Sequence, residues 1–167
     1  MLEIFNKLRP FFEDCYREIG VREFSREIGI SPPTASVFLK ESTKEGYFIG
    51  RQDRGLLLFR INRSNDVLMI LSKLYWQEKL RELVDFVEEE LMSKTIILFG
   101  SLVKLEVTKN SDIDLVVISK HKKELNFSKF EKKLDRKIQV FYEKDMSFLP
   151  IELKKNVING FVLRGRF

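Results

Sequence analysis

The sequence predicts an α+β protein of two modules, and three observations support this class. Helical periodicity followed by a hairpin signal occupies residues 1–64, and a long helical segment follows at residues 65–92. Short apolar runs separated by polar segments then occupy residues 93–167. A chain of 167 residues is long enough for two small domains. We therefore expect domains at 1–64 and 93–167, joined by the connecting helical segment at 65–92.

Composition places the chain among soluble globular proteins. Apolar residues make up 44% of it, and no run approaches the roughly 18 residues of a membrane span. The first residues lack the features of a signal peptide, which favours a cytoplasmic protein with no membrane partner. Cys15 is the only cysteine, so an intramolecular disulfide is excluded and a zinc site is not expected. The net charge of +5 permits nucleic-acid or nucleotide partners without requiring them.

The first module should contain three helices and a hairpin. An apolar stripe predicts a first helix over residues 2–19, and a second, short helix over residues 21–28 should end at a glycine. Ser31 has the character of an N-cap with Pro32 at the first helical position, so a third helix should begin there. Two apolar runs joined across residues 53–55 then predict the hairpin.

This order and the segment VREFSREIGISPPTASVFLKESTKEGYF resemble the winged helix-turn-helix family. The resemblance implies that the helix from Ser31 is the recognition helix and that residues 51–55 form the wing, with duplex DNA as partner. The residues that it places nearest to DNA are Pro33, Thr34, Ser36, Val37 and Lys40 of the helix and Arg51 and Arg54 of the wing. Glu41 and Glu45 offset the lysines of the helix, so an alternative is that this module packs against its neighbour or dimerises.

The segment from Thr95 to Ser119 carries the most specific pattern of the chain. An apolar run over residues 96–99 predicts a buried strand that ends at Gly100 and Ser101. A second buried strand should follow over residues 113–118, with Asp112 before it and Asp114 inside it. The linked spacing G-S-x10-D-x-D arises by chance roughly once per 10⁵ start positions. It therefore outweighs the alternative of a simple turn with a solvated edge aspartate.

These residue types suit the binding of a nucleotide with a metal ion. Residues i and i+2 of a strand share a face, so Asp112 and Asp114 should project together, about 6–7 Å apart. Two buried carboxylates need a compensating cation, and rigid oxygen ligands suit Mg²⁺ or Mn²⁺. Gly100 lets backbone N–H groups approach a phosphate closely, and the hydroxyl of Ser101 adds a donor. The pattern predicts a site for a nucleoside triphosphate.

Residues 95–167 resemble the polymerase-β-like minimal nucleotidyltransferases, which carry a G-S pair followed by a D-x-D strand. The resemblance implies a mixed sheet, with Gly100 and Ser101 on the triphosphate and Asp112 and Asp114 on two Mg²⁺ ions. It implies transfer of a nucleoside monophosphate from an NTP, with ATP expected, to a hydroxyl of a protein tyrosine, a nucleic-acid end or a small molecule. Minimal members of this family often act as antitoxins that nucleotidylate a toxin, which makes a co-encoded protein a possible acceptor.

In one position the chain departs from that family. Active members carry a further carboxylate on a later strand, and Gln139 stands at the corresponding position here. Glutamine brings no charge and cannot act as a base. Glu143 lies on the same face but roughly 13 Å along an extended strand. A rival hypothesis is therefore a DNA-binding regulator, or an antitoxin-like protein, whose second module senses nucleotide or is catalytically inactive.

The remaining segments have weaker signals. Residues 66–92 should be helical with a break near Trp76, and their apolar coverage is too wide for a bare linker. Residues 120–137 contain eight basic residues and three acidic ones, which form either a solvated surface or a site for a polyanion. Within and after them we expect, in order, a helix at 128–135, a strand at 138–142, a helix at 150–159 and a strand at 161–163.

Overall fold

The computed structural model describes residues 2–166, which form two compact units. The first contains the residues up to Ser72 together with Leu105–Lys109, and the second contains Lys73–Lys104 and the residues from Asn110 on. The predicted connecting segment at 65–92 is thus divided between them at Ser72. Within the described part of the chain, no helix is long and apolar enough to span a membrane.

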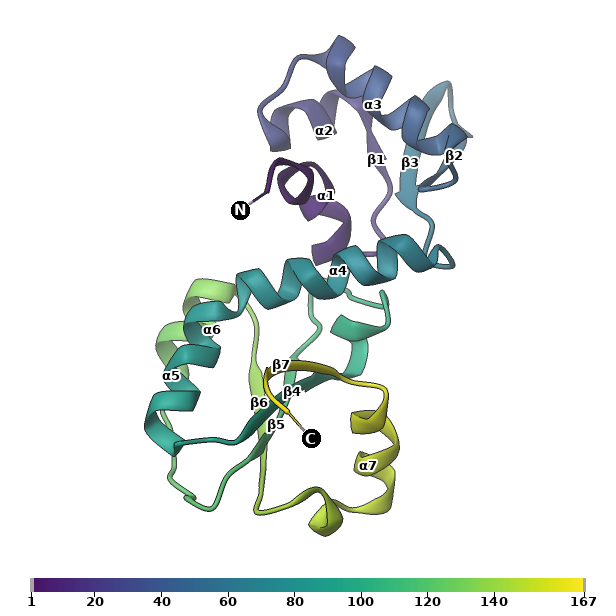
Figure 1. Cartoon of the computed structure of the whole chain (residues 1–167). Helices are drawn as coiled ribbons and strands as arrows, with labels where there is room; N and C mark the ends of the chain where they lie inside the picture. Colours follow the sequence, from purple (N-terminus) through teal and green to yellow (C-terminus); the bar gives the residue numbers. More distant parts are fainter. Residues whose placement is uncertain (1, 167) are drawn as a thin grey trace. The chain divides into compact units, whose positions relative to one another are not determined.

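The first unit consists of helices around a small antiparallel sheet (Figure 1). The three strands have the order β1-β3-β2, and every neighbouring pair is antiparallel. Phe11, Phe12 and Phe24 are fully buried and form the centre of its core. Its elements are α1 (Glu3–Glu13), β1 (Ile19–Gly20), α2 (Val21–Ile28), α3 (Pro32–Lys44), β2 (Phe48–Asp53), β3 (Leu56–Ile61) and the first part of α4 (Asp66–Lys79).

The first helix is shorter than the sequence predicts. It ends at Glu13, and Asp14 has extended backbone angles. Cys15 is buried, and it lies beyond the end of the helix. Ile19 pairs with Phe59 of β3, so backbone pairing with a distant strand takes this residue out of the helix. Helical periodicity in the sequence could not reveal this strand pairing, because a buried apolar residue fits a helix as well as a strand.

The third helix and the hairpin agree with the sequence signals. Ser31 is the N-cap of α3, where its Oγ accepts a hydrogen bond from the N–H of Thr34, and Pro32 opens the helix. The turn of the hairpin consists of Arg54 and Gly55, which both have positive φ, as a tight turn between antiparallel strands requires. The element order is the one expected for a winged helix, and the assignment to that family stays a prediction.

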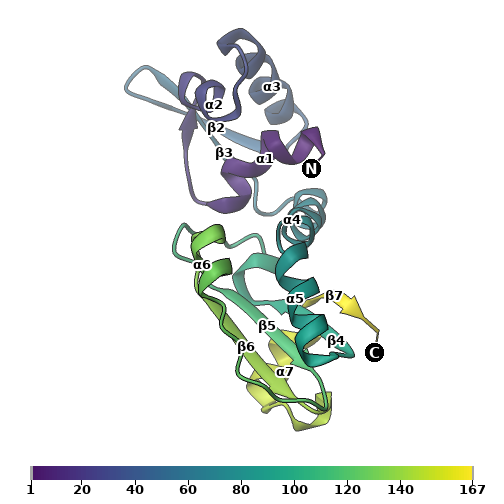
Figure 2. The same cartoon turned by 90° about the vertical axis from the view of Figure 1, so that its left-hand side faces the viewer.

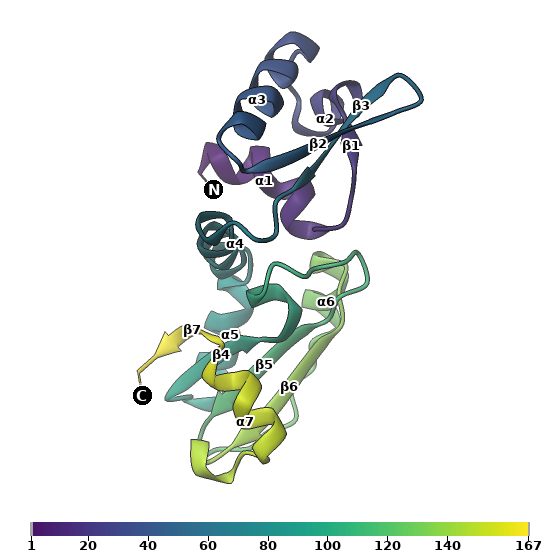
Figure 3. The same cartoon turned by 90° about the vertical axis from the view of Figure 1, so that its right-hand side faces the viewer.

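The second unit is a four-stranded mixed sheet with helices on both faces (Figures 2 and 3). The strand order is β6-β5-β4-β7, with β5 and β6 parallel and the other pairs antiparallel, which confirms the predicted mixed sheet. Helix α7 covers one face and α5 the other. The elements that follow α4 are α5 (Arg81–Leu91), β4 (Thr95–Phe99), the 3-10 helix η1 (Gly100–Val103), β5 (Ile113–Ile118), α6 (Ser128–Leu134), β6 (Ile138–Glu143), the 3-10 helix η2 (Met146–Phe148), α7 (Ile151–Ile158) and β7 (Phe161–Gly165).

The two central strands are buried because their residues are apolar on both faces. Every residue of β4 is buried, and in β5 only Asp114 is partly exposed. Leu149 and Val157 pack on the α7 face of this sheet and complete the core there. The helical break is expected near Trp76, but α4 continues past that residue and the break lies at Leu80, between α4 and α5. The two central strands therefore provide a rigid base for the polar residues at their ends.

Candidate functional site

The glycine that ends β4 lies against the aspartate inside β5. Gly100 has a φ of +77°, in the left-handed region that favours glycine. A Cβ added to Gly100 would lie only 2.4 Å from Oδ2 of Asp114. Phe99 and Asp114 are direct partners across the antiparallel pair, which places this carboxylate at the turn into η1. The absence of a side chain at residue 100 is therefore required by both backbone conformation and space.

Gln139 stands beside the two aspartates. It is the parallel-sheet partner of Asp114 and lies on β6, which Figure 2 shows beside β5. Its Nε2 donates a hydrogen bond of 2.6 Å to Oδ2 of Asp112. Asp112 precedes β5 by one residue, and Asp114 is the second residue of that strand. Strands β5 and β6 thus bring two carboxylates and one amide to the same end of the sheet.

The electrostatics of this group favour a cation. Burial raises the pKa of Asp114 above its usual value, and the nearby charge of Asp112 raises it further. A positive ion between the two groups would relieve that repulsion, and carboxylate and amide oxygens are the ligands that Mg²⁺ prefers. Among residues 2–166, no group of three or more His, Cys, Asp or Glu side chains could hold a metal ion. The donor set fits one divalent ion bound through Asp112 and Asp114.

The raised pKa of Asp114 predicts a pH-dependent stability. Below the usual carboxyl pKa both folded and unfolded chains are protonated there, so burial carries no charge penalty. As pH rises through the elevated folded-state pKa, the folded protein loses stability because it must hold a buried anion. Asp114→Asn should therefore raise the thermal midpoint at pH 7 in metal-free buffer and change it little at pH 3. A thermal-melt series from pH 3 to 8 checks this, and an equal effect at all pH values would contradict it.

The sequence predicted these positions but not their contacts. Gly100, Ser101, Asp112 and Asp114 come together at one end of the sheet, with Ser101 half-buried in η1. The close approach of Gly100 to Asp114 and the bond from Gln139 to Asp112 have no local sequence signal. Both depend on the register between strands that are distant in the sequence.

The residues predicted to contact DNA lie on α3 and the hairpin, and most are exposed. Thr34 and Lys40 are exposed and Ser36 is half-buried. Arg54 is exposed in the turn of the hairpin. Arg51 is exposed too, but its Nε donates to Glu18 Oε1 at 3.2 Å, and its guanidinium also pairs with Asp53. The positive charge of Arg51 is therefore partly neutralised within the protein.

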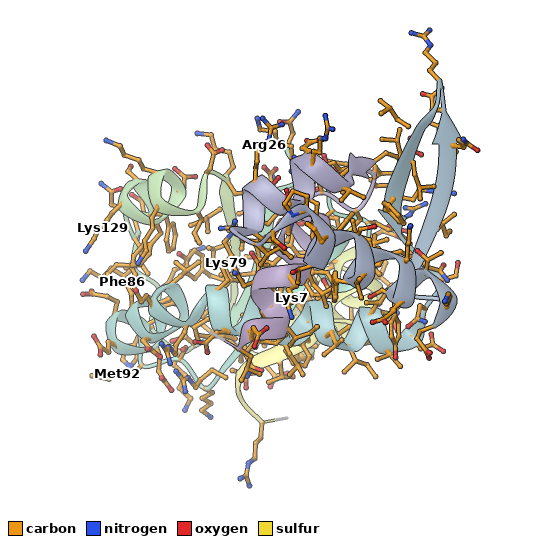
Figure 4. The ribbon with its side chains drawn as sticks, turned by 90° about the horizontal axis from the view of Figure 1, so that it is seen from above. Lys7, Arg26, Lys79, Phe86, Met92 and Lys129 are labelled. Atoms are coloured by element: carbon orange, nitrogen blue, oxygen red, sulfur yellow. The ribbon has the colours of Figure 1, made fainter. Side chains whose placement is uncertain are left out.

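The outer surface of α3 also borders a shallow groove. The groove has a volume of about 470 Å³ and includes the apolar side chains of Val37 and Phe38. Lys7 of α1 lies over the ring of Phe38, 5.6 Å from its centre, and can be located in Figure 4. Val37 is 54% exposed, so this face presents an apolar side chain to solvent. The surface of α3 at this groove thus includes both polar and apolar side chains.

The comparisons with known proteins support the description of the second unit. The family model of the nucleotidyltransferase domain matches residues 80–162, a segment that contains Gly100, both aspartates and Gln139. No match was found among the curated proteins or among the solved structures. This match supports a nucleotidyltransferase domain in the second half of the chain.

Proposed function

We propose that this domain transfers a nucleoside monophosphate from an NTP, with ATP the expected donor, to a hydroxyl acceptor. The observation that supports this best is the contact of Gly100 with the Asp114 carboxylate, beside Asp112 and Gln139. Gly100 and Ser101 would hold the β- and γ-phosphates through backbone N–H groups and a hydroxyl. Asp112 and Asp114 would hold Mg²⁺, which when bound supplies positive charge to the triphosphate.

In this reaction the acceptor oxygen forms a bond to the α-phosphorus while the bond to the β-phosphate breaks, which releases pyrophosphate. The proton of the acceptor hydroxyl needs a base. Gln139 cannot take it, because an amide has no basic nitrogen at neutral pH. We expect the proton to pass to water and transfer to be slow in the absence of a better base.

The same residue favours a second candidate function. The amide of Gln139 donates a hydrogen bond to one oxygen of Asp112 and cannot act as a base. These residues are therefore better suited to binding a nucleotide than to transferring one. In that case the domain binds a nucleotide with one metal ion and reports its presence without transfer. The first unit would then be the effector, as a DNA-binding regulator.

Incubation with α-labelled NTPs, Mg²⁺ and the protein encoded by the neighbouring gene separates the two functions. Label transferred to that protein or to an added hydroxyl compound supports the transferase. Tight Mg–ATP binding without any transferred label supports the nucleotide sensor.

We also propose that the first unit binds duplex DNA through α3 and the hairpin, chiefly by contacts to phosphate. Because Arg54 is exposed in the hairpin turn, Arg54→Ala should lower the slope of log affinity against log salt by about one unit. Arg51→Ala should change that slope less, because Glu18 and Asp53 already neutralise much of its charge. Fluorescence-anisotropy titrations at several salt concentrations measure both slopes. If neither variant changes the slope, the hairpin does not contact phosphate.

A further inference from the structure

An arginine of the second unit contacts both the residue before Asp112 and the only tryptophan of the chain. Arg136 follows α6, and its Nη1 donates a hydrogen bond of 2.6 Å to the carbonyl oxygen of Ser111. Ser111 is the residue directly before Asp112. The guanidinium of the same arginine lies over the ring of Trp76, 5.2 Å from the ring centre. Arg136 thus connects the main chain at the site to a buried aromatic ring.

The ring is a firm support for this contact. Trp76 is fully buried, and Lys79 Nζ lies 5.2 Å from the centre of its ring. Tyr75 packs edge-on against it with ring centres 5.3 Å apart. A side chain in such surroundings has little freedom to rotate, because protein interiors are closely packed. The guanidinium of Arg136 is therefore held by its cation–π contact with this ring as well as by its hydrogen bond to Ser111.

The main chain on the other side of Asp112 is held by the same segment. The N–H of Ile113 donates to the carbonyl oxygen of Lys137 at 2.8 Å. Residues 136 and 137 thus fix the backbone immediately before and immediately after Asp112, and the amide of Gln139 fixes its side chain. Asp114 needs no such support because it lies within β5. Asp112 precedes that strand, so its position depends on these contacts.

We propose that Arg136 is a positioning residue for the metal-binding carboxylate of Asp112, with Trp76 as its anchor. This inference rests on the proposed function, since it concerns the same metal and nucleotide site. Outer-shell partners that orient a ligand typically change metal affinity by about 10–100-fold when they are removed. Because Trp76 is the only tryptophan, the emission of the protein also reports directly on the contact with Arg136.

The experiment compares the full-length wild type with Arg136→Ala, Arg136→Lys and Lys129→Ala. Lys129→Ala is the matched control, because this substitution removes one positive charge from an exposed position on α6. The side chain of Lys129 is labelled in Figure 4. Calorimetry measures the affinity for Mn²⁺ and for Mg–ATP, and thermal melting measures stability. Tryptophan emission is recorded with and without saturating Mg–ATP, so that a lower affinity alone cannot remove the response.

The wild type should change its tryptophan emission on binding Mg–ATP, because Arg136 contacts both the ring of Trp76 and the main chain before Asp112. Arg136→Ala should lower the affinity for Mn²⁺ by about tenfold or more and should abolish this emission change at saturating Mg–ATP. Arg136→Lys keeps the charge but loses the planar guanidinium, so it should be intermediate in both measurements. Lys129→Ala should match the wild type. A purely structural role would lower the thermal midpoint without removing the emission response at saturation.

The inference is overturned if Arg136→Ala binds Mn²⁺ as tightly as the wild type and keeps its emission response. If the alanine variant does not fold, the lysine variant decides by the same two measurements. Failure of the proposed function gives a different result, in which the wild type itself binds no Mg–ATP, and the role of Arg136 is then overturned with it.

Discussion

Gln139→Asp is expected to raise nucleotidyl transfer by about a hundredfold, which is the lower end of what a positioned base contributes. Gln139 is the direct strand partner of Asp114 and lies within hydrogen-bond distance of Asp112, so an aspartate there would complete a group of three carboxylates. It would supply both a further ligand for a second Mn²⁺ and a base for the acceptor hydroxyl. The transfer rate with α-labelled ATP and the number of bound Mn²⁺ ions measure these two effects.

Glu143 provides the matched control for this prediction. It is a carboxylate on the same strand and the same face, but β6 stays extended as far as Glu143, whose strand partner is Ile118. The strand does not bend back, so Glu143 cannot reach the aspartates, and Glu143→Gln should leave Mn²⁺ binding and transfer unchanged. If the wild type already binds two Mn²⁺ ions and Gln139→Asp changes nothing, another carboxylate completes the site.

Gly100→Ala should abolish Mg–ATP binding and also destabilise the protein. The added methyl group would lie 2.4 Å from the carboxylate of Asp114, so either that side chain or the backbone must move away. The positive φ adds backbone strain of about 1–3 kcal/mol in the folded state. Calorimetry with Mg–ATP and chemical denaturation measure the two effects separately.

Gly29→Ala separates the strain from the loss of space. Gly29 ends α2 with a φ of +73°, close to that of Gly100, but nothing lies within 4 Å of an added Cβ. This variant should be destabilised by backbone strain alone, by about 1 kcal/mol, and should bind Mg–ATP like the wild type. If Gly100→Ala behaves in the same way, the contact with Asp114 has no importance for the site.

The two strands that carry the candidate site were predictable from the sequence because they are short and apolar. The spacing of Gly100, Ser101, Asp112 and Asp114 required only two buried strands and the loop between them. The position of Gln139 depended on the resemblance to a known family, and the register of β5 with β6 agrees with it. The supporting contacts of Arg136 had no signal, because it was one of eight basic residues in residues 120–137.

Two features of the first unit could not be predicted, because distant partners compete with local ones. Ile19 fits the helical stripe of the first segment, yet it pairs with Phe59 because the β3 edge offers it backbone hydrogen bonds. Arg51 is expected to contact DNA, and no signal in the sequence indicates that Glu18, which is 33 residues away, accepts hydrogen bonds from it. Neither partner can be identified from a window of neighbouring residues.

The central claim is that the aspartates beside Gly100 bind a nucleotide together with a divalent ion. Calorimetric titration of the wild type with ATP, with and without Mg²⁺, beside the same titration of Asp112→Asn tests it most directly. We predict that Mg²⁺ makes the wild type bind ATP much more tightly. In the presence of Mg²⁺, Asp112→Asn should bind ATP about tenfold or more weakly than the wild type, because removing a direct metal ligand should cost at least as much affinity as removing an outer-shell partner. Equal affinities in the two proteins, or a wild-type affinity that does not depend on Mg²⁺, would contradict the claim.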